Sequence, residues 1–195
     1  MFTGIIETTG IIRRIENEGT NVHFSIESSL GAELKVDQSI SHNGVCLTVT
    51  RVEGKLHQVT AILETIRKST LALWTSGDRI NLERCMLNNG RFDGHIVQGH
   101  VDQVGICKSV EDENGSWIFE FEYDPEFGNI TVEKGSVAVD GVSLTCFDSG
   151  QNKFKVAIIP YTFQHTNFGR IRSSDKVNLE FDIVGKYVRK LVVPR

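Results

Sequence analysis

Short runs that alternate apolar and polar residues recur along the whole chain. Residues Trp117 to Tyr123 read Trp-Ile-Phe-Glu-Phe-Glu-Tyr, the period-two pattern of a half-buried strand. Residues Val45 to Val52 are rich in β-branched side chains and precede a tight turn at Glu53-Gly54-Lys55. Leu56 to Leu63 and Arg79 to Glu83 also fit strands. With about six such runs in each half and little helix, the pattern predicts an all-β protein.

Helical periodicity is confined to three places. Glu64 to Leu73 fits a short helix, and Tyr161 to Arg170 fits its counterpart in the second half. Near the end of the chain, apolar residues form a helical stripe made of Ile183, Val184, Tyr187, Val188 and Leu191. A helix this short is not stable alone in water. The stripe therefore packs either on a barrel or on copies of itself, and we favour self-association.

The two halves of the chain are copies of one another. Residues 39–83 align without a gap on residues 136–180, and 13 of the 45 pairs are identical, ending in a shared Asn-Leu-Glu. The first strand also repeats, since Gly4 falls on Gly99. An uninterrupted offset of this kind indicates a duplication. We expect two tandem, similar six-stranded Greek-key barrels over residues 1–90 and 91–184, followed by a short C-terminal oligomerisation helix over residues 185–195.

Composition excludes several classes of protein. The net charge of -4 and the pI of about 5.9 argue against nucleic acid as a partner, because phosphate binding needs a concentrated positive face. No apolar run approaches the roughly 20 residues that span a bilayer, and the first residues lack the pattern of a signal peptide. The four cysteines form no C-x-x-C pair, so we expect reduced thiols and a cytoplasmic location.

Four segments together resemble the riboflavin synthase family. They are residues 1–7 (MFTGIIE), 43–49 (NGVCLTV), 94–102 (GHIVQGHVD) and 140–145 (DGVSLT), in family order and in both halves. The resemblance covers nearly the whole chain. It departs at Gln103, where the family usually has glycine, and at Cys146, where an aliphatic residue is commoner. Neither departure falls on a candidate catalytic residue.

The resemblance implies a reaction that closes riboflavin biosynthesis. Two molecules of 6,7-dimethyl-8-ribityllumazine dismutate by four-carbon transfer to riboflavin and 5-amino-6-(D-ribitylamino)uracil, without a metal, flavin or nicotinamide cofactor. It also implies a homotrimer held partly by C-terminal helices. Each active site would lie between the N-barrel of one subunit and the C-barrel of its neighbour. Association with lumazine synthase stays open.

The same resemblance carries over a set of substrate-binding positions. The glycines among them permit close backbone approach, and the threonines suit a polyhydroxylated ribityl chain. In the N-barrel the positions are Phe2, Gly4, Ile5, Ile6, Cys46, Leu47, Thr48, Thr60, Ala61, Ile62, Leu63, Glu64 and Thr65. In the C-barrel they are Gly99, His100, Val101, Lys134, Ser143, Leu144, Thr145, Ala157, Ile158, Ile159, Pro160, Tyr161 and Thr162.

The candidate catalytic residues follow from the places where the two copies differ. Cys46 aligns with Ser143, Asn43 with Asp140, and Ile5 with His100. One lumazine must receive a nucleophile at ring carbon C7 and the other must lose a proton from its C7 methyl. His100 suits the proton transfer, and Ser143 or Cys46 suits addition to the ring or the orientation of a water. Asp182, Ser39 and Thr145 complete the candidate set.

Three rival functions stay open at this point. A non-catalytic lumazine or flavin carrier of the same family would share the barrels but lose residues of the C-terminal site. A nucleic-acid-binding barrel is opposed by the acidic charge, and a flavin reductase barrel by the lack of a dinucleotide fingerprint. A zinc site at His95 and His100 is disfavoured by their spacing. Without the family, the Asn43-Gly44 and Asp140-Gly141 pairs would be ordinary hairpin turns.

Overall fold

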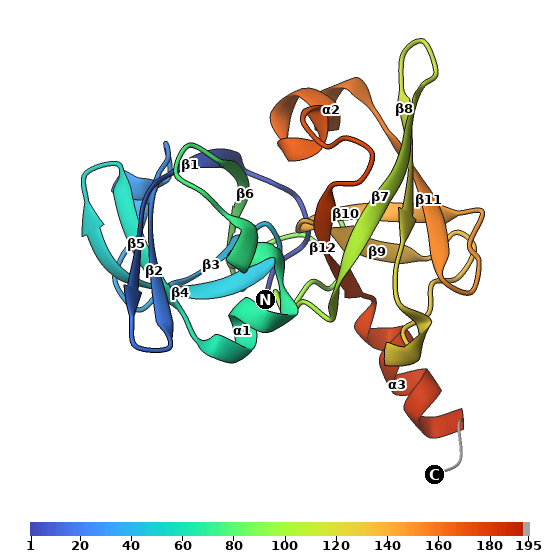
Figure 1. Ribbon diagram of the computed structural model, residues 1–195, viewed down its shortest axis with the longest axis horizontal. Helices are drawn as coiled ribbons and strands as arrows, with labels where there is room; N and C mark the ends of the chain where they lie inside the picture. The colour runs from blue at the N-terminus through green and yellow to red at the C-terminus, as the bar shows by residue number, and fades with distance from the viewer. Residues whose placement is uncertain (193–195) are drawn as a thin grey trace.

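The computed structural model describes residues 1–192, and the last three residues of the predicted terminal helix lie outside the described residues. The first half of the chain closes six antiparallel strands into a barrel in the order β1-β2-β5-β4-β3-β6, on the left of Figure 1. The strands are β1 (Thr8–Glu18), β2 (Asn21–Glu27), β3 (Ser39–His42), β4 (Val45–Glu53), β5 (Leu56–Ala61) and β6 (Arg79–Arg84). A short 3-10 helix, η1 (Gly31–Glu33), precedes β3.

The second half repeats this barrel in the order β10-β11-β8-β7-β12-β9. Its strands are β7 (Gln103–Asp112), β8 (Trp117–Glu122), β9 (Ser136–Val139), β10 (Val142–Phe147), β11 (Lys153–Ile158) and β12 (Lys176–Phe181), with the 3-10 helix η3 (Pro125–Phe127) before β9. Each strand of the first barrel has its counterpart in the same place in the second. The prediction of two tandem six-stranded barrels is confirmed.

The two barrels fill their interiors differently. The second core is rich in phenylalanine, with Phe119, Phe121 and Phe154 fully buried. The first core is mostly aliphatic but contains two buried histidines, whose Nε2 atoms lie 2.9 Å apart, His42 on β3 and His57 on β5. Burial lowers the pKa of both imidazoles, that of His57 to about 4. The first barrel therefore carries a neutral polar pair where the second has Val139 and Phe154.

Two matching hairpin turns bring the barrels together. Asn43-Gly44 joins β3 to β4 and Asp140-Gly141 joins β9 to β10, with φ values of 44° and 78° in the first and 45° and 80° in the second. Positive φ at both central residues defines the type I′ turn that Asn-Gly and Asp-Gly favour. A Cβ on Gly44 would lie 2.7 Å from the backbone nitrogen of Gly141. The two turns pack directly on one another, so Asn43-Gly44 and Asp140-Gly141 hold the two barrels together.

A buried hydrogen-bond network formed mainly by asparagines connects the two barrels at the same interface. Asn81 Nδ2 donates to the Asp140 carbonyl, and its repeat partner Asn178 donates to the Asn43 carbonyl, at 2.9 and 2.8 Å. The symmetry breaks at Asp140, whose carboxylate accepts hydrogen bonds from Asn178 N and Asn167 Nδ2. Burial raises the pKa of Asp140 to about 7, against those hydrogen bonds. The structure thus places Asp140 at the barrel interface.

The two predicted ten-residue helices are each broken in the middle. The first is α1 (Leu63–Lys68) followed by the 3-10 helix η2 (Thr70–Leu73), and the second is α2 (Pro160–His165) followed by η4 (Asn167–Gly169). Ser69 and Thr166 separate the pieces with extended backbone, and their hydroxyls donate to carbonyls four residues back and accept the N–H two residues on. Such hydroxyl caps end one helix and start the next.

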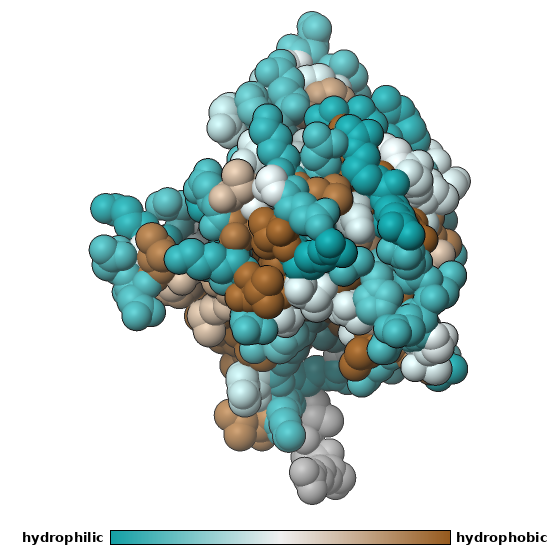
Figure 2. All heavy atoms as spheres, turned by 90° about the vertical axis from the view of Figure 1, so that its left-hand side faces the viewer, coloured by the Kyte–Doolittle hydropathy of each residue, from teal (hydrophilic) through white to brown (hydrophobic). Residues whose placement is uncertain are grey.

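The terminal helix α3 (Ile183–Val192) starts two residues before the predicted boundary at 185, because Asp182 Oδ1 accepts the N–H of Val184 and caps it. Figures 1 and 2 show α3 extending away from the barrels, with hydrophobic residues on its visible surface. Val184, Tyr187, Val188 and Leu191 are all more than half exposed. In the single chain the apolar stripe therefore stays largely uncovered. No helix among residues 1–192 has the length and apolar character needed to cross a bilayer.

Candidate functional site

Two short segments cross between the barrels. We call residues 1–6 the first leading segment and residues 97–101 the second, because each precedes the first strand of its own barrel. They meet where Phe2 and Val97 form an antiparallel bridge, with N···O distances of 2.7 and 3.1 Å. Beyond the bridge, Ser143 N donates to the Gly4 carbonyl at 2.8 Å, and Cys46 N donates to the Gly99 carbonyl at 2.9 Å. Each leading segment thus reaches the other barrel.

A buried glutamate on the last strand of each barrel holds the leading segment in place. The Glu83 carboxylate accepts the N–H groups of Thr3 and Gly4, and the Glu180 carboxylate accepts those of residues 98–100. Burial raises the pKa of Glu83, and raises that of Glu180 to about 7. The shared Asn-Leu-Glu that ends both repeats therefore builds the crossing.

The crossing changes which segment serves which binding position. The resemblance assigned residues 4–6 to the N-barrel and residues 99–101 to the C-barrel. In the structure Ile6 packs on the core of the second barrel and Val101 on the core of the first. Ile5, by contrast, lines a space together with Ser39 of the first barrel, so each leading segment contacts both barrels. A repeat offset shows which residues are equivalent, but not which barrel each one touches.

The second barrel carries a hollow of about 350 Å³ between β10 and the start of α2. Most of its lining was predicted from the resemblance, and the residues are Lys134, Ser143, Leu144, Thr145, Ala157, Ile159 and Thr162, together with Cys146 and Phe147. Lys134 has a positive φ of 63°, and its Nζ lies 5.8 Å from the centre of the Phe147 ring. We call this space the C-hollow.

The repeat-equivalent surface of the first barrel is the N-face, which contains Cys46, Thr48, Thr60, Ile62 and Thr65. Thr48 and Ile62 are exposed, and Thr60 Oγ1 lies 2.8 Å from His23 Nδ1.

Four of the predicted binding residues have side chains that are buried in the protein interior, namely Phe2, Leu47, Ala61 and Ile158. Alternate side chains of a strand point to opposite faces, so these residues can reach a ligand only through their backbone groups. Leu63, Glu64, Pro160 and Tyr161 are exposed at the starts of α1 and α2.

Ser143 has a partner that the sequence did not reveal. His95 Nδ1 lies 2.7 Å from Ser143 Oγ. Burial lowers the pKa of His95, and the Asp182 carboxylate acts against that shift. His95 has no counterpart in the repeat and lies 48 positions from Ser143. In the sequence it was considered only as a possible zinc ligand together with His100.

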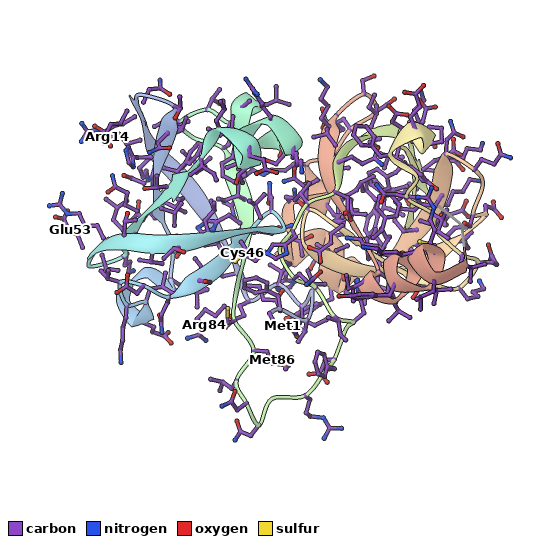
Figure 3. All side chains as sticks on the ribbon, turned by 90° about the horizontal axis from the view of Figure 1, so that it is seen from below. Met1, Arg14, Cys46, Glu53, Arg84 and Met86 are labelled. Atoms are coloured by element: carbon purple, nitrogen blue, oxygen red, sulfur yellow. The ribbon has the colours of Figure 1, made fainter. Side chains whose placement is uncertain are left out.

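Cys46 occupies the equivalent place in the first barrel, where the two barrels meet (Figure 3). Its side chain packs on a small cluster formed by Phe2, Val97 and Ala138. Burial raises the pKa of the Cys46 thiol, and the side chain of Ser39 opposes this rise. Ser39 also lines a larger space of about 650 Å³ that includes Ile5. All four cysteines are free thiols.

The remaining candidates are less close together. His100 is exposed and its N–H is bound by Glu180, and it follows Gly99, whose carbonyl accepts the N–H of Cys46. Thr145 lines the C-hollow. Asp182 caps α3 and lines a separate space beside it. The structure brings together Ser143, Thr145 and His95 in the second barrel, and Cys46 and Ser39 in the first.

Two like barrels with paired binding surfaces match a known class of domain. The sequence pattern of the family described as Lumazine binding domain matches residues 3–85 and again residues 98–182. The solved structure of LumP complexed with 6,7-dimethyl-8-(1'-D-ribityl) lumazine superposes with a TM-score of 0.84 over 92% of this chain and 98% of that chain, at 19% identity. The riboflavin complex of LumP also gives 0.84, at 21% identity. At such identities the likeness concerns the fold.

Proteins related in sequence identify the family within this class of domain. Riboflavin synthase of Actinobacillus pleuropneumoniae is 37% identical over 196 residues, covering 100% of this chain and 91% of its own length. The enzyme of Bacillus subtilis is 37% identical over 193 residues, covering 98% and 90%. That of Saccharomyces cerevisiae is 36% identical over 208 residues, covering 99% and 87%. The chain belongs to the riboflavin synthase family.

Proposed function

We propose that the chain catalyses the dismutation of two 6,7-dimethyl-8-ribityllumazine molecules to riboflavin and 5-amino-6-(D-ribitylamino)uracil. The observation that carries this proposal is the match over the full chain to riboflavin synthases of bacteria and yeast. A duplicated barrel supplies two similar binding surfaces for two identical rings. Holding both rings in register contributes several kcal/mol to the rate, since effective molarities reach about 10⁵ M or more.

The two binding surfaces act on their lumazines in different ways. In the C-hollow, Ser143 supplies a hydroxyl for addition at ring carbon C7, and Thr145 and Thr162 bind the ribityl chain. On the N-face, Cys46 and the neighbouring His100 serve the second ring, where a proton must leave the C7 methyl. The neighbouring Ser39 acts on the Cys46 thiol by opposing the burial that raises its pKa.

The active unit is a homotrimer. The uncovered stripe on α3 supports self-association, because exposed apolar side chains in a row are stabilised by burial against a partner. The N-face of one subunit then faces the C-hollow of the next. Replacing Tyr187 and Leu191 with lysine should convert a trimer into monomers by analytical ultracentrifugation and abolish turnover. A variant that stays trimeric would remove α3 from the interface.

A lumazine carrier is the second candidate, because LumP shares the fold at a TM-score of 0.84. The two functions separate in one experiment. Purified protein is mixed with dimethylribityllumazine in buffer without added cofactor, and products are separated by chromatography. An enzyme forms one riboflavin for every two lumazines consumed. A carrier retains the lumazine and consumes none. A cytoplasmic location and association with lumazine synthase stay predictions.

A further inference from the structure

A histidine of the first barrel is hydrogen-bonded to one of the residues of the N-face. His23 on β2 pairs with Thr60 on β5, and its Nδ1 lies 2.8 Å from Thr60 Oγ1. The other ring nitrogen, Nε2, lies 2.9 Å from a carboxylate oxygen of Glu18 at the end of β1. Only 22% of the His23 side chain is exposed. The imidazole is therefore held by a hydrogen bond at each of its two nitrogens.

The direction of these two hydrogen bonds follows from the chemistry of the groups. An ionised carboxylate only accepts hydrogen bonds, so Nε2 carries the hydrogen that Glu18 accepts. In the neutral imidazole Nδ1 is then the acceptor, and the Thr60 hydroxyl donates to it. Within residues 1–192 this is the one hydrogen bond of that hydroxyl. The lone pairs of Thr60 Oγ1 therefore stay available to a donor on a ligand.

The second barrel has apolar side chains at both equivalent positions. There Ala157 on β11 pairs with Ile118 on β8, in the same register in which Thr60 pairs with His23. Ala157 lines the C-hollow, so its counterpart Thr60 occupies the matching place on the N-face. The N-face thus offers a ligand one oriented hydroxyl that the C-hollow lacks.

We propose that His23 is a positioning residue of the N-face, which orients the Thr60 hydroxyl to accept a hydrogen bond from the lumazine bound there. This inference rests on the proposed function. The donors of a lumazine are the hydroxyls of its ribityl chain and the N–H of its ring. Without His23 the Thr60 hydroxyl can rotate, and binding loses the advantage of an acceptor that is oriented beforehand. The pair therefore raises the affinity of the N-face for its lumazine through a contact that the C-hollow cannot make.

The test replaces the pair with the residues of the second barrel. Thr60→Ala, His23→Ile and the double variant are titrated with 6-methyl-8-ribityllumazine, which cannot transfer carbons because it lacks the C7 methyl group. Calorimetry on the full chain follows the two classes of binding sites. We expect each variant to weaken one class by about three- to tenfold and to leave the other within about twofold. Unchanged affinity of both classes in Thr60→Ala would overturn the proposal.

Two comparisons show whether His23 acts through Thr60. His23→Asn places an amide oxygen near the position of Nδ1, where it can accept the Thr60 hydroxyl, so this variant should recover most of the affinity lost in His23→Ile. The double variant should bind no more weakly than Thr60→Ala alone, because both changes remove the same contact. A fully additive loss in the double variant, or equal losses in His23→Asn and His23→Ile, would contradict the proposal.

The binding measurement does not depend on turnover, so it separates the two levels of inference. A wild-type protein that binds the analogue as expected but forms no riboflavin from 6,7-dimethyl-8-ribityllumazine refutes the proposed reaction and leaves the role of His23 supported by the variants. A wild type that forms riboflavin, together with a Thr60→Ala variant of undiminished affinity, refutes the role of His23 alone.

Discussion

The two barrels are alike where they contact each other and unlike at the surfaces that we propose to bind lumazine. Glu83 and Glu180 each accept backbone N–H groups of a leading segment. Asn81 and Asn178 each donate a hydrogen bond to a backbone carbonyl of the other barrel. At the binding surfaces, by contrast, Ser143 with His95 replaces Cys46 with Ser39. Duplication kept the scaffold symmetric because symmetric contacts stabilise both copies. The proposed function gives a reason for the difference, because the two lumazines must undergo different steps.

The largest expected effect comes from removing Ser143, the proposed nucleophile of the second barrel. Ser143→Ala should lower kcat by about 10²-fold or more, with lumazine binding nearly unchanged, because the lost interaction is made with the reacting ring. Steady-state kinetics and fluorescence titration measure the two quantities. Cys46→Ala tests the other side of the comparison. Equal kcat in wild type and Ser143→Ala would mean that the difference between the barrels has no catalytic meaning.

The crossing of the leading segments predicts the next largest effect. Gly4 has a φ of +79°, and a Cβ there would lie 2.6 Å from Ser143 Cβ. Gly4→Ala should cost about 2–5 kcal/mol of unfolding free energy, from the left-handed backbone and the forced contact together. Gly99→Ala should cost a similar amount against Cys46, where the distance is 2.5 Å.

The matched control for these variants is Gly19→Ala. Gly19 also has a positive φ, of +59°, but no atom lies within 4 Å of its added Cβ. It should therefore lose only the backbone contribution of about 1–2 kcal/mol in denaturant titration. If Gly4→Ala costs no more than Gly19→Ala, the segments do not cross as described.

The buried histidine pair predicts that acid weakens the first barrel. The pKa of His57 is about 4 in the folded protein against 6.5 when unfolded, so the unfolded state binds more protons in between. Stability should fall as the pH falls from about 6.5 to about 4, by up to about 3 kcal/mol from His57. The variant His42→Val with His57→Phe copies the residues of the second barrel and should lose this slope. A slope unchanged in the double variant, measured by denaturation at several pH values, would show that the pair is not its source.

The smallest effect concerns the broken symmetry at the interface. The folded pKa of Asp140 is about 7 against 3.8 unfolded, so its contribution to stability falls as the pH rises from about 4 to about 7. Asp140→Asn with Asn167→Thr installs the residues of the first copy. Because the variant also gives up the hydrogen bond from Asn167 to the carboxylate, it should have a net gain of only about 1–2 kcal/mol over wild type at pH 8, and the gain should shrink towards pH 5. A gain independent of pH would exclude Asp140 as the cause.

Much of the fold could be predicted from the sequence, whereas the site could be predicted only in part. The repeat and the alternating runs predict both barrels, and the resemblance predicts most of the lining of the C-hollow. The crossing of Gly4 and Gly99 could not be predicted, since an offset between copies does not tell which barrel a segment touches. His95 was missed because its bond to Ser143 is made through tertiary structure, with no repeat partner to mark it.

Mixing two inactive variants tests most directly whether unlike surfaces of neighbouring subunits work as a pair. Ser143→Ala and Cys46→Ala chains are co-produced in equal amounts, and riboflavin formation is compared with that of each variant alone. If each site joins the N-face of one subunit to the C-hollow of another and the chains assemble at random, about a quarter of all sites have both residues intact, and activity returns to about a quarter of wild type. Activity no higher than the mean of the two separate variants would contradict the account.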